Sequence, residues 1–221
     1  MAINIIDEDS LYIHADTLIA TGPSEKRILR GYYDVRIFKT DLRGKSDSLY
    51  LDQSTGLIKL LKLPLTRKEE QIFTASQKNS RNPILWFGKS QMSGNKIFLT
   101  SDMKTKKLDS LKILGNSWII EEDSISDKGF NQIKGGLLDG LFKEGELREI
   151  YISKNTEVIY YMYSDDDNEL IGIDKTTCSR LKMITADNQI EDITFFVNPD
   201  GDLYPDKDLS INDRKLEGFV W

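Results

Sequence analysis

The chain has 221 residues, 39% of them hydrophobic, and a formal net charge of −6 at pH 7. This length fits one large domain or two small ones, and the acidic balance argues against nucleic-acid binding, which depends on clustered Lys and Arg. No run approaches the roughly 20 apolar residues of a membrane-spanning helix. The first residues, MAINIIDEDS, have neither the basic start nor the apolar stretch of a signal peptide. We therefore expect a cytosolic protein or a mature chain whose leader has been removed.

The composition gives little support for a catalytic site or a metal-binding site. Cys178 is the only cysteine, so an internal disulfide and a cysteine metal cage are both excluded, and we expect a small structural residue in a strand. His14 is the only histidine, which leaves a single position for the commonest general base. No paired-carboxylate spacing stands out among the 36 acidic residues. We predict no catalytic residues, no metal site, no cofactor and no enzymatic activity.

The first half of the chain predicts strands with one exception. DSLYI at Asp9 and DSLYL at Asp47 are nearly identical and are interpreted as early copies of one repeated strand. The exception lies near residues 66–79, where Thr66 is followed three residues later by Glu69, the spacing of a capping box. We expect a short helix there, within an insertion at 65–82. The insertion is interpreted as a surface excursion, with a lid or a partner contact as the alternative.

The second half repeats one pattern. LDSLKILGNSWII from Leu108 aligns without a gap on LREIYISKNTEVI from Leu147 at an offset of 39, so that Asn116 meets Asn155 and Ile119 meets Val158. IEDITFFVNPDGDLY from Ile190 fits as a third copy at an offset of 43. The preceding segments also correspond: QMSGNKIFLTSD from Gln91, QIKGGLLDGLFK from Gln132 and, more loosely, TTCSRLKMITAD from Thr176.

One unit of the repeat is interpreted as an apolar strand, a short polar turn, a second strand of the LxxIxI type, an Asn-centred corner and a third strand. Apolar and polar residues alternate within the strands, as in Ile150 and Ile152 on either side of Tyr151. This alternation is typical of antiparallel strands with one buried face. LREIYISKNTEVIYY accordingly predicts a hairpin with its corner at Lys154 and Asn155.

A repeat of about 40 residues made of strands does not close a core by itself, so neighbouring units must stack. A β-propeller, a β-solenoid and an elongated open roll are the candidates, and the absence of WD-like signatures disfavours the propeller. We predict an all-β, elongated, twisted β-jellyroll over residues 1–221 as a single repeat-built domain. In that roll Leu111, Ile113, Ile150, Ile152, Ile193 and Phe195 lie in register along one apolar interior.

The blocks of this repeat resemble a known family. GYYDVRIFKTDLRGKSDSLYLD, NPILWFGKSQMSGNKIFL, KLDSLKILGNSWII, NQIKGGLLDGLF, ELREIYISKNTEVIYY and ITFFVNPDGDLYP look like the OstA-like proteins of the lipopolysaccharide-transport system, relatives of LptA and of the N-terminal domain of LptD. The resemblance runs from about Asp9 to Trp221, apart from the stretch between Leu65 and Arg81. Its blocks are specific as a set, since each alone is only a strand with a turn.

The resemblance implies a periplasmic, non-enzymatic protein that shelters lipopolysaccharide acyl chains in its interior and joins other copies or other transport components end to end. The predicted lipid-binding interior comprises Leu49, Leu51, Ile97, Leu99, Leu111, Ile113, Trp118, Ile120, Leu138, Ile150, Ile152, Val158, Tyr160, Leu181, Met183, Ile193 and Phe195. The alternatives are that these residues form only a structural core, and that the roll is an assembly or scaffold module without lipid cargo. Lys104, Lys106 and Lys107 are interpreted as a solvated turn, with contact to lipid phosphates near an opening as the alternative.

Overall fold

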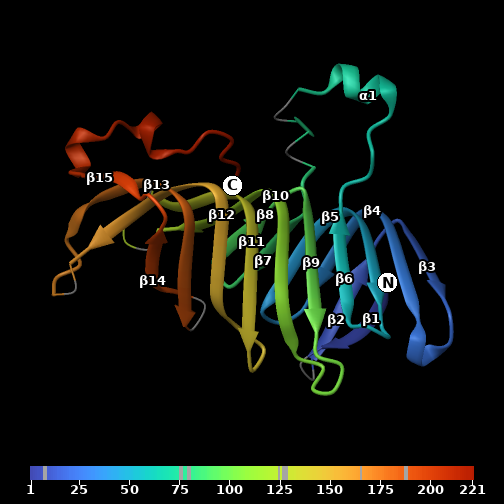
Figure 1. Cartoon of the computed structure of the whole chain (residues 1–221). Helices are drawn as coiled ribbons and strands as arrows, with labels where there is room; N and C mark the ends of the chain where they lie inside the picture. Colours follow the sequence, from blue (N-terminus) through green and yellow to red (C-terminus); the bar gives the residue numbers. More distant parts are fainter. Residues whose placement is uncertain are drawn as a thin grey trace.

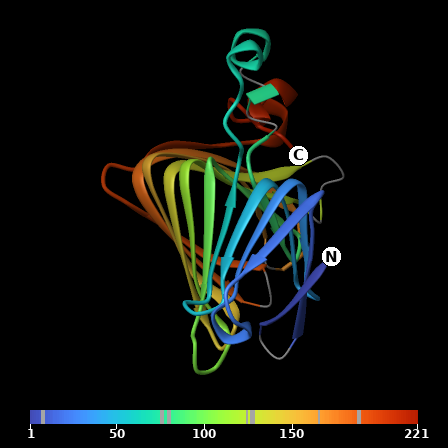
Figure 2. The ribbon, with the colours of Figure 1, turned by 90° about the vertical axis from the view of Figure 1, so that its right-hand side faces the viewer.

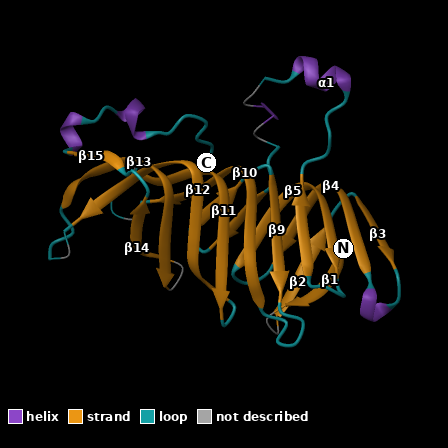
Figure 3. Cartoon of the chain, in the orientation of Figure 1, coloured by secondary structure: helices purple, strands orange, loops and turns teal. Residues whose placement is uncertain are grey.

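A computed structural model describes residues 1–6, 9–74, 77–78, 81–123, 125, 129–164, 166–186 and 189–221 of the chain. These residues are mostly in strands (Figure 3). The strands are β1 (Ala2–Ile6), β2 (Asp9–His14), β3 (Thr17–Thr21), β4 (Ile28–Phe38), β5 (Leu42–Asp52), β6 (Leu57–Leu61), β7 (Ile84–Phe87), β8 (Ser90–Ser93), β9 (Lys96–Ser101), β10 (Leu108–Glu122), β11 (Phe130–Lys143), β12 (Glu146–Tyr163), β13 (Leu170–Ala186), β14 (Gln189–Phe196) and β15 (Asp200–Tyr204). The helices are α1 (Arg67–Ile72) and the 3-10 turns η1 (Ser24–Lys26), η2 (Asp206–Asp208) and η3 (Ile211–Arg214). The prediction of an all-β protein is confirmed.

All the described strands belong to one antiparallel sheet that bends into two walls (Figures 1 and 2). Most long strands contribute one half to each wall, because they pair with different partners on the two sides of a bend. The half of β10 up to Leu114 pairs with β9, and the half from Trp118 pairs with β8. We call the wall that contains β3, β6, β9 and β14 the first wall, and the wall that contains β1, β2, β7, β8 and β15 the second wall.

Several of the bends lie at pairs of residues with positive φ, whereas β5, β11 and β13 bend without such a pair. Such pairs occur at Tyr33–Asp34, Gly115–Asn116, Lys154–Asn155 and Val197–Asn198. The pairing register shifts at the first three of these places, as expected for a bulge that bends a strand. The repeating Asn of the sequence is explained by this conformation, because Asn adopts the left-handed region more readily than other residues that carry a Cβ. The offsets of 39 and 43 are the spacings between the Asn-containing bends at Asn116, Asn155 and Asn198.

The predicted hairpin at LREIYISKNTEVIYY is wrong. Leu147 to Tyr161 belong to a single strand, β12, which continues through Lys154 and Asn155 from the first wall into the second. Two consecutive residues with φ of 71° and 54° bend the strand without reversing it, whereas the chain reverses at the ends of the strands, for example near Gly145. The second and third strands of the predicted units at Leu108 and Leu147 are therefore single strands, β10 and β12, whereas those of the unit at Ile190 stay separate as β14 and β15.

The first wall carries two continuous inward rows that confirm the predicted register. One row passes through Leu18, Gly31, Leu49, Leu60, Ile97, Ile113, Leu138, Ile152, Leu181 and Phe195. The other passes through Leu29, Leu51, Ile58, Leu99, Leu111, Gly140, Ile150, Met183 and Ile193. Ile113 and Ile152 do not lie on adjacent strands, because β11, with Leu138, lies between β10 and β12.

The two DSLY segments do not occupy equivalent places. Asp9 begins β2 in the second wall, whereas Asp47 lies near the bend of β5, so that Leu49 and Leu51 fall in the first wall. The interpretation of these segments as copies of one strand is wrong, because the same alternating pentapeptide suits an inward face in either wall.

The insertion replaces one of the bends. β6 and β7 both pair with β5, on its first-wall and second-wall halves respectively, and the chain between them leaves the sheet as the excursion that carries α1 (Figure 1). Thr66 and Glu69 form the predicted capping box. Helix α1 ends at Ile72, residues 77 and 78 are helical again, and residues 75, 76, 79 and 80 of the expected helix at 66–79 lie outside the described part. Arg81 anchors the base of the excursion through a 2.6 Å ion pair with Asp47.

The last residues, 205–221, cover the outer face of the second wall. A second apolar cluster forms there, separate from the interior, and is made of Trp118, Ile120, Ile159, Tyr161, Ile173, Leu209 and Leu216. Gln132 fixes the segment through both of its side-chain groups: its amide donates to the Arg214 carbonyl at 2.7 Å, and its oxygen accepts from the Leu216 amide at 2.9 Å. None of the helices in the described residues is long and apolar enough to cross a membrane.

Candidate functional site

A large opening into the interior lies near the N-terminal end of the roll, where β1 approaches the turns of the first wall. It has a volume of about 580 Å³, within the range of small-molecule sites. Leu51 and Ile58 line it and also belong to the buried interior cluster, with 2% and 1% of their surfaces exposed. We call this opening the N-terminal mouth. It connects solvent with the apolar rows of the first wall.

The rim of the N-terminal mouth is polar and carries one lysine of the basic cluster. Lys106, Asp52, Gln53 and Ser101 line it together with the exposed apolar residues Ile3 and Met103. Lys107 lies outside this lining and forms a 3.0 Å ion pair with Glu144. The structure thus separates the cluster: Lys106 faces the mouth, and Lys107 bridges to the next turn.

Two polar side chains of the mouth, Asp52 and Ser101, differ in their hydrogen bonding. The hydroxyl and the amide of Ser54 donate to the Asp52 carboxylate at 2.6 and 2.9 Å, which lowers the pKa of Asp52 and keeps it ionised. The buried hydroxyl of Ser101 has no hydrogen-bond partner among the described residues. A hydroxyl of this kind gains a bond if a ligand brings an acceptor or a donor.

Most of the predicted interior residues lie in the interior. Twelve are in the buried interior cluster, namely Leu49, Leu51, Ile97, Leu99, Leu111, Ile113, Leu138, Ile150, Ile152, Val158, Leu181 and Met183. Tyr160, Ile193 and Phe195 are partly buried and pack against that cluster. Cys178 also belongs to it, in agreement with the structural role expected for the cysteine. Whether any of these side chains contacts a lipid stays a prediction.

Trp118 and Ile120 are not interior residues, so this part of the prediction is wrong. Both point to the outer face of the second wall and pack under residues 205–221. Their neighbour Ile119 points inward instead, in a row with Met92, Ile133 and Val158. The gapless alignment already indicated that Ile119 faces inward, because it paired Ile119 with Val158, a predicted interior residue.

The sequence repeat does not predict much of the second wall. The interior cluster contains these buried residues of the second wall: Leu11, Ile13, Val35, Ile37, Leu42, Leu85, Phe87 and Met92. Short alternating stretches such as VRIF and ILWF are signals that could have found them. The repeat follows the LxxIxI strands, which form the first wall, and therefore does not include these stretches.

Side chains fill the interior farther along the roll. The cavity bounded by Phe87, Met92, Ile150 and Met183 has a volume of about 20 Å³, which is room for about one water molecule. An alkyl chain therefore does not fit at this level unless the walls move apart. The N-terminal mouth, by contrast, is open as it stands.

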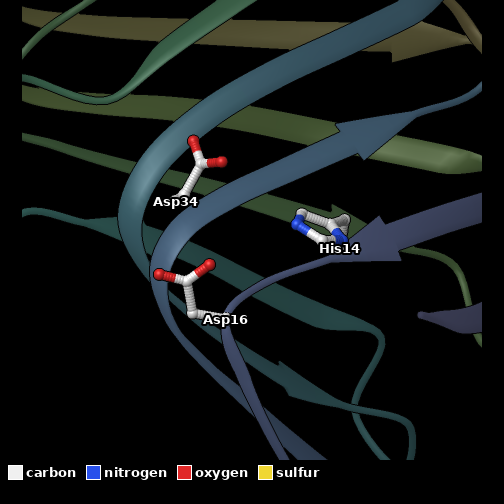
Figure 4. A group of neighbouring side chains, drawn as sticks. All are labelled: His14, Asp16 and Asp34. Carbon is white, nitrogen blue, oxygen red and sulfur yellow. The ribbon is translucent and has the colours of Figure 1, made fainter.

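One group of possible metal ligands lies at a bend near the N-terminal end. His14 ends β2, Asp16 follows it and Asp34 lies at the bend of β4 (Figure 4), with ligand atoms within 4.8 Å of one another. Arg36 binds both oxygens of Asp34, from Nε at 3.2 Å and from a terminal nitrogen at 3.0 Å. His14 and Asp16 are exposed. The guanidinium competes with a cation for Asp34, so this group carries no functional assignment.

Solved structures similar to this chain exist. No family model and no curated protein matches the chain. The chain is similar to the crystal structure of LptH, the LptA homologous periplasmic component of the conserved lipopolysaccharide transport device from Pseudomonas aeruginosa, with 12% identity and a TM-score of 0.48. The similarity covers 74% of this chain and 95% of that one. An identity of 12% transfers no residue's role, and the OstA-like resemblance stays a prediction.

Proposed function

We propose that the protein binds an amphiphilic lipid at the N-terminal mouth, with an acyl chain on Leu51 and Ile58 and the headgroup at Lys106. The observation that carries this proposal is the contact of an open, 580 Å³ mouth with the buried apolar rows. Each methylene removed from water contributes about 0.8 kcal/mol, so even a partly inserted chain gains substantial free energy. No bond is made or broken in such a role.

The proposed ligand class is lipopolysaccharide or a related lipid, handled as part of a periplasmic lipopolysaccharide-transport system. Support comes from the resemblance of the repeat blocks and from the placement of Lys106, whose ammonium suits a lipid phosphate. Because side chains fill the interior beyond the mouth, the acyl chain enters at the mouth first. Passage deeper into the interior requires the two walls to separate.

A photocrosslinking scan tests the proposal. A crosslinkable amino acid at Leu51 or Ile58 is expected to label with lipopolysaccharide, whereas the same group at Tyr50 or Lys59, the outward-facing neighbours, is expected not to label. Equal labelling at both sets of positions contradicts the proposal. Phospholipid vesicles without lipopolysaccharide serve as the comparison ligand.

A charge variant tests the headgroup contact separately. Lys106→Glu is expected to weaken lipopolysaccharide binding by about tenfold through loss of a charge-assisted contact and gain of repulsion. Lys104→Glu is the matched control, because Lys104 lies in the same turn but outside the lining of the mouth. Equal loss in both variants would show a nonspecific charge effect.

A second candidate function is end-to-end assembly, with or without lipid. Apolar side chains are exposed at both ends of the roll: Met1 and Ile3 at β1, and Phe196, Val197 and Leu203 beside β14 and β15. Edge strands with exposed apolar residues favour pairing with another sheet. We propose that β14 or β15 of one copy pairs with β1 or β3 of the next.

The mass in solution tests the assembly proposal. Sedimentation is expected to show concentration-dependent oligomers that Val197→Lys suppresses. Ile211→Lys is the control, since Ile211 is 76% exposed but lies in the C-terminal segment away from the edge strands. A protein that stays monomeric at all concentrations contradicts head-to-tail assembly by the free chain.

A further inference from the structure

The C-terminal segment covers only part of the outer face of the second wall. Its last contact toward the N-terminal end is with β8, where the Gln91 side-chain amide donates to the Val220 carbonyl at 2.8 Å. On the strands before β8 the outward side chains are open to solvent, and Tyr12 and Phe38 are 41% and 47% exposed. The N-terminal half of this outer face is therefore a free surface of the chain.

Two outward rows of aromatic and basic side chains cross this free surface. The first row consists of Tyr12, Phe38, Arg43 and Trp86. The second row, two residues away along each strand, consists of His14, Arg36, Lys45 and Ile84. Residues two apart in a strand project to the same side of a sheet, so both rows present their side chains together. We call the two rows the basic-aromatic face.

Positive charge is concentrated on the basic-aromatic face. Arg36, Arg43 and Lys45 are exposed, and neither row contains a carboxylate. Arg36 pairs with Asp34 at the adjoining bend, at 3.0 Å, which leaves Arg43 and Lys45 as the excess. The chain as a whole has a net charge of −6, so this face has the opposite sign to the rest of the molecule.

The outer face of the first wall differs in its charge balance. Rings and cations also occur there, but carboxylates of neighbouring strands pair with the lysines. Lys112 lies 2.9 Å from Asp139, and Lys182 lies 3.1 Å from Glu149. Rings beside an excess of positive charge therefore distinguish the basic-aromatic face from the other outer surface.

A hollow of about 460 Å³ adjoins Arg43 and Trp86 at the edge of the basic-aromatic face. Residues of the turns between β4 and β5 and between β7 and β8 also line it, among them Asp41. Asp41 is ion-paired with Lys39 at 2.7 Å, so its charge is offset. A phosphate group can therefore approach the Arg43 guanidinium, whose planar donors suit phosphate oxygens, without meeting an unpaired carboxylate.

We propose that the basic-aromatic face docks on the surface of a bilayer that contains anionic phospholipids. Tyr and Trp favour the boundary between headgroups and acyl chains, because their rings are apolar and their polar atoms stay hydrated. Lys and Arg are attracted to the negative potential of anionic headgroups. A lipid surface thus suits both components of the face, the rings and the charges.

Docking by this face brings the N-terminal mouth to the bilayer. Ile3 of β1 lies opposite Tyr12 and is 57% exposed, and it also lines the mouth. The docking surface itself is made of other residues than the mouth, so it does not depend on lipid binding there.

Co-sedimentation of the full chain with phosphatidylcholine vesicles, with and without phosphatidylglycerol, tests the proposal. Binding is expected only to vesicles that contain phosphatidylglycerol, and it is expected to weaken as salt is added. Lys45→Glu is expected to weaken binding by about tenfold, because each basic residue near an anionic surface contributes roughly fivefold in affinity. Lys96→Glu makes the same charge change at an exposed lysine of β9 in the first wall and is expected to leave binding unchanged.

A second pair of variants tests the rings. Phe38→Ala is expected to weaken vesicle binding by about threefold or more through loss of apolar contact. Ile19→Ala is the matched control, because Ile19 is 45% exposed on β3 of the first wall and is expected to leave binding unchanged. Equal loss within either pair of variants overturns docking by this face.

Two further measurements separate the proposal from its alternatives. Lys106→Glu, which alters the N-terminal mouth, is expected to leave vesicle binding unchanged, and a loss there would assign vesicle binding to the mouth. Polyglutamate and a single-stranded oligonucleotide are the competing polyanions, and both are expected to bind more weakly than the vesicles. Tighter binding of either one, or equal binding to vesicles without phosphatidylglycerol, overturns the assignment of an anionic lipid surface.

Discussion

Gly135 lies directly against Ile152. A Cβ built on Gly135 would stand 2.5 Å from Cγ2 of Ile152, and one built on Gly94 would stand 2.4 Å from Cγ2 of Ile113. The two glycines occupy equivalent places beside bends of the sheet, and the repeated QxxG of the sequence marks both. The isoleucine of the neighbouring strand fills the space that a side chain would need.

Gly135→Ala is therefore expected to destabilise the fold by about 1 to 3 kcal/mol, the usual cost of overpacking a core. Denaturant unfolding measures the change. Gly140→Ala is the control on the same strand and is expected to cost less, because its added Cβ would meet the movable end of Leu147 at 2.9 Å and Cβ of Leu111 at 3.2 Å. If both variants lose the same stability, the contact with Ile152 is not the cause.

Asn155 has φ of 54° at the bend of β12. Asn155→Val is expected to destabilise the protein by about 1 to 2 kcal/mol, because a β-branched residue tolerates the left-handed region poorly. Asn155→Gly is expected to be neutral or slightly stabilising. Thermal unfolding of the pair is the measurement, and equal loss in both would show that the Asn side chain matters more than the backbone conformation.

Gln132 is fully buried and binds the backbone of the C-terminal segment at Arg214 and Leu216. Gln132→Leu leaves a carbonyl and an amide without these partners, at about 1 to 3 kcal/mol for each buried unpaired group. Faster hydrogen exchange at the Leu216 amide is expected, together with a lower unfolding temperature. Lys134→Met serves as the control, because it removes a contact to Glu217 from a more exposed side chain. Unchanged exchange at Leu216 would contradict this role of Gln132.

Asp174 pairs with Tyr160 on the interior face and is half-buried. Burial raises its pKa above the ordinary 3.8, and the bond from the Thr176 hydroxyl only partly opposes this. The folded protein then binds the proton more tightly than the unfolded chain, so this residue's contribution to stability falls as pH rises from 3.8 through the folded pKa. Above that interval the loss is constant.

Asp174→Asn is expected to raise stability at pH 7 and to flatten the fall of stability above pH 3.8. The free energy of unfolding measured from pH 3 to pH 7 checks this. Asp109→Asn, an exposed residue, gives the same change in charge as a control. A stability profile unaltered by Asp174→Asn would show that the carboxylate is better solvated than its position indicates.

The alternating pattern by itself determined the strands of the first wall and their register. Leu111, Ile113, Ile150, Ile152, Ile193 and Phe195 lie in the predicted rows because side chains of a strand alternate between two faces, and only one assignment buries the apolar set. The sequence by itself also determined the capping box of α1, because this motif needs only Thr66 and Glu69 at the right spacing.

Only the tertiary structure decided which face is the interior. Trp118 and Ile120 are as apolar as Ile119, and residues 205–221 bury them on the outer face of the second wall. A strand buried on both faces loses the alternation that distinguishes inside from outside. The bend at Lys154–Asn155 was likewise undetermined by the sequence, because Asn suits a reversing turn and a bulge equally, and the pairing with β11 and β13 selects the bulge.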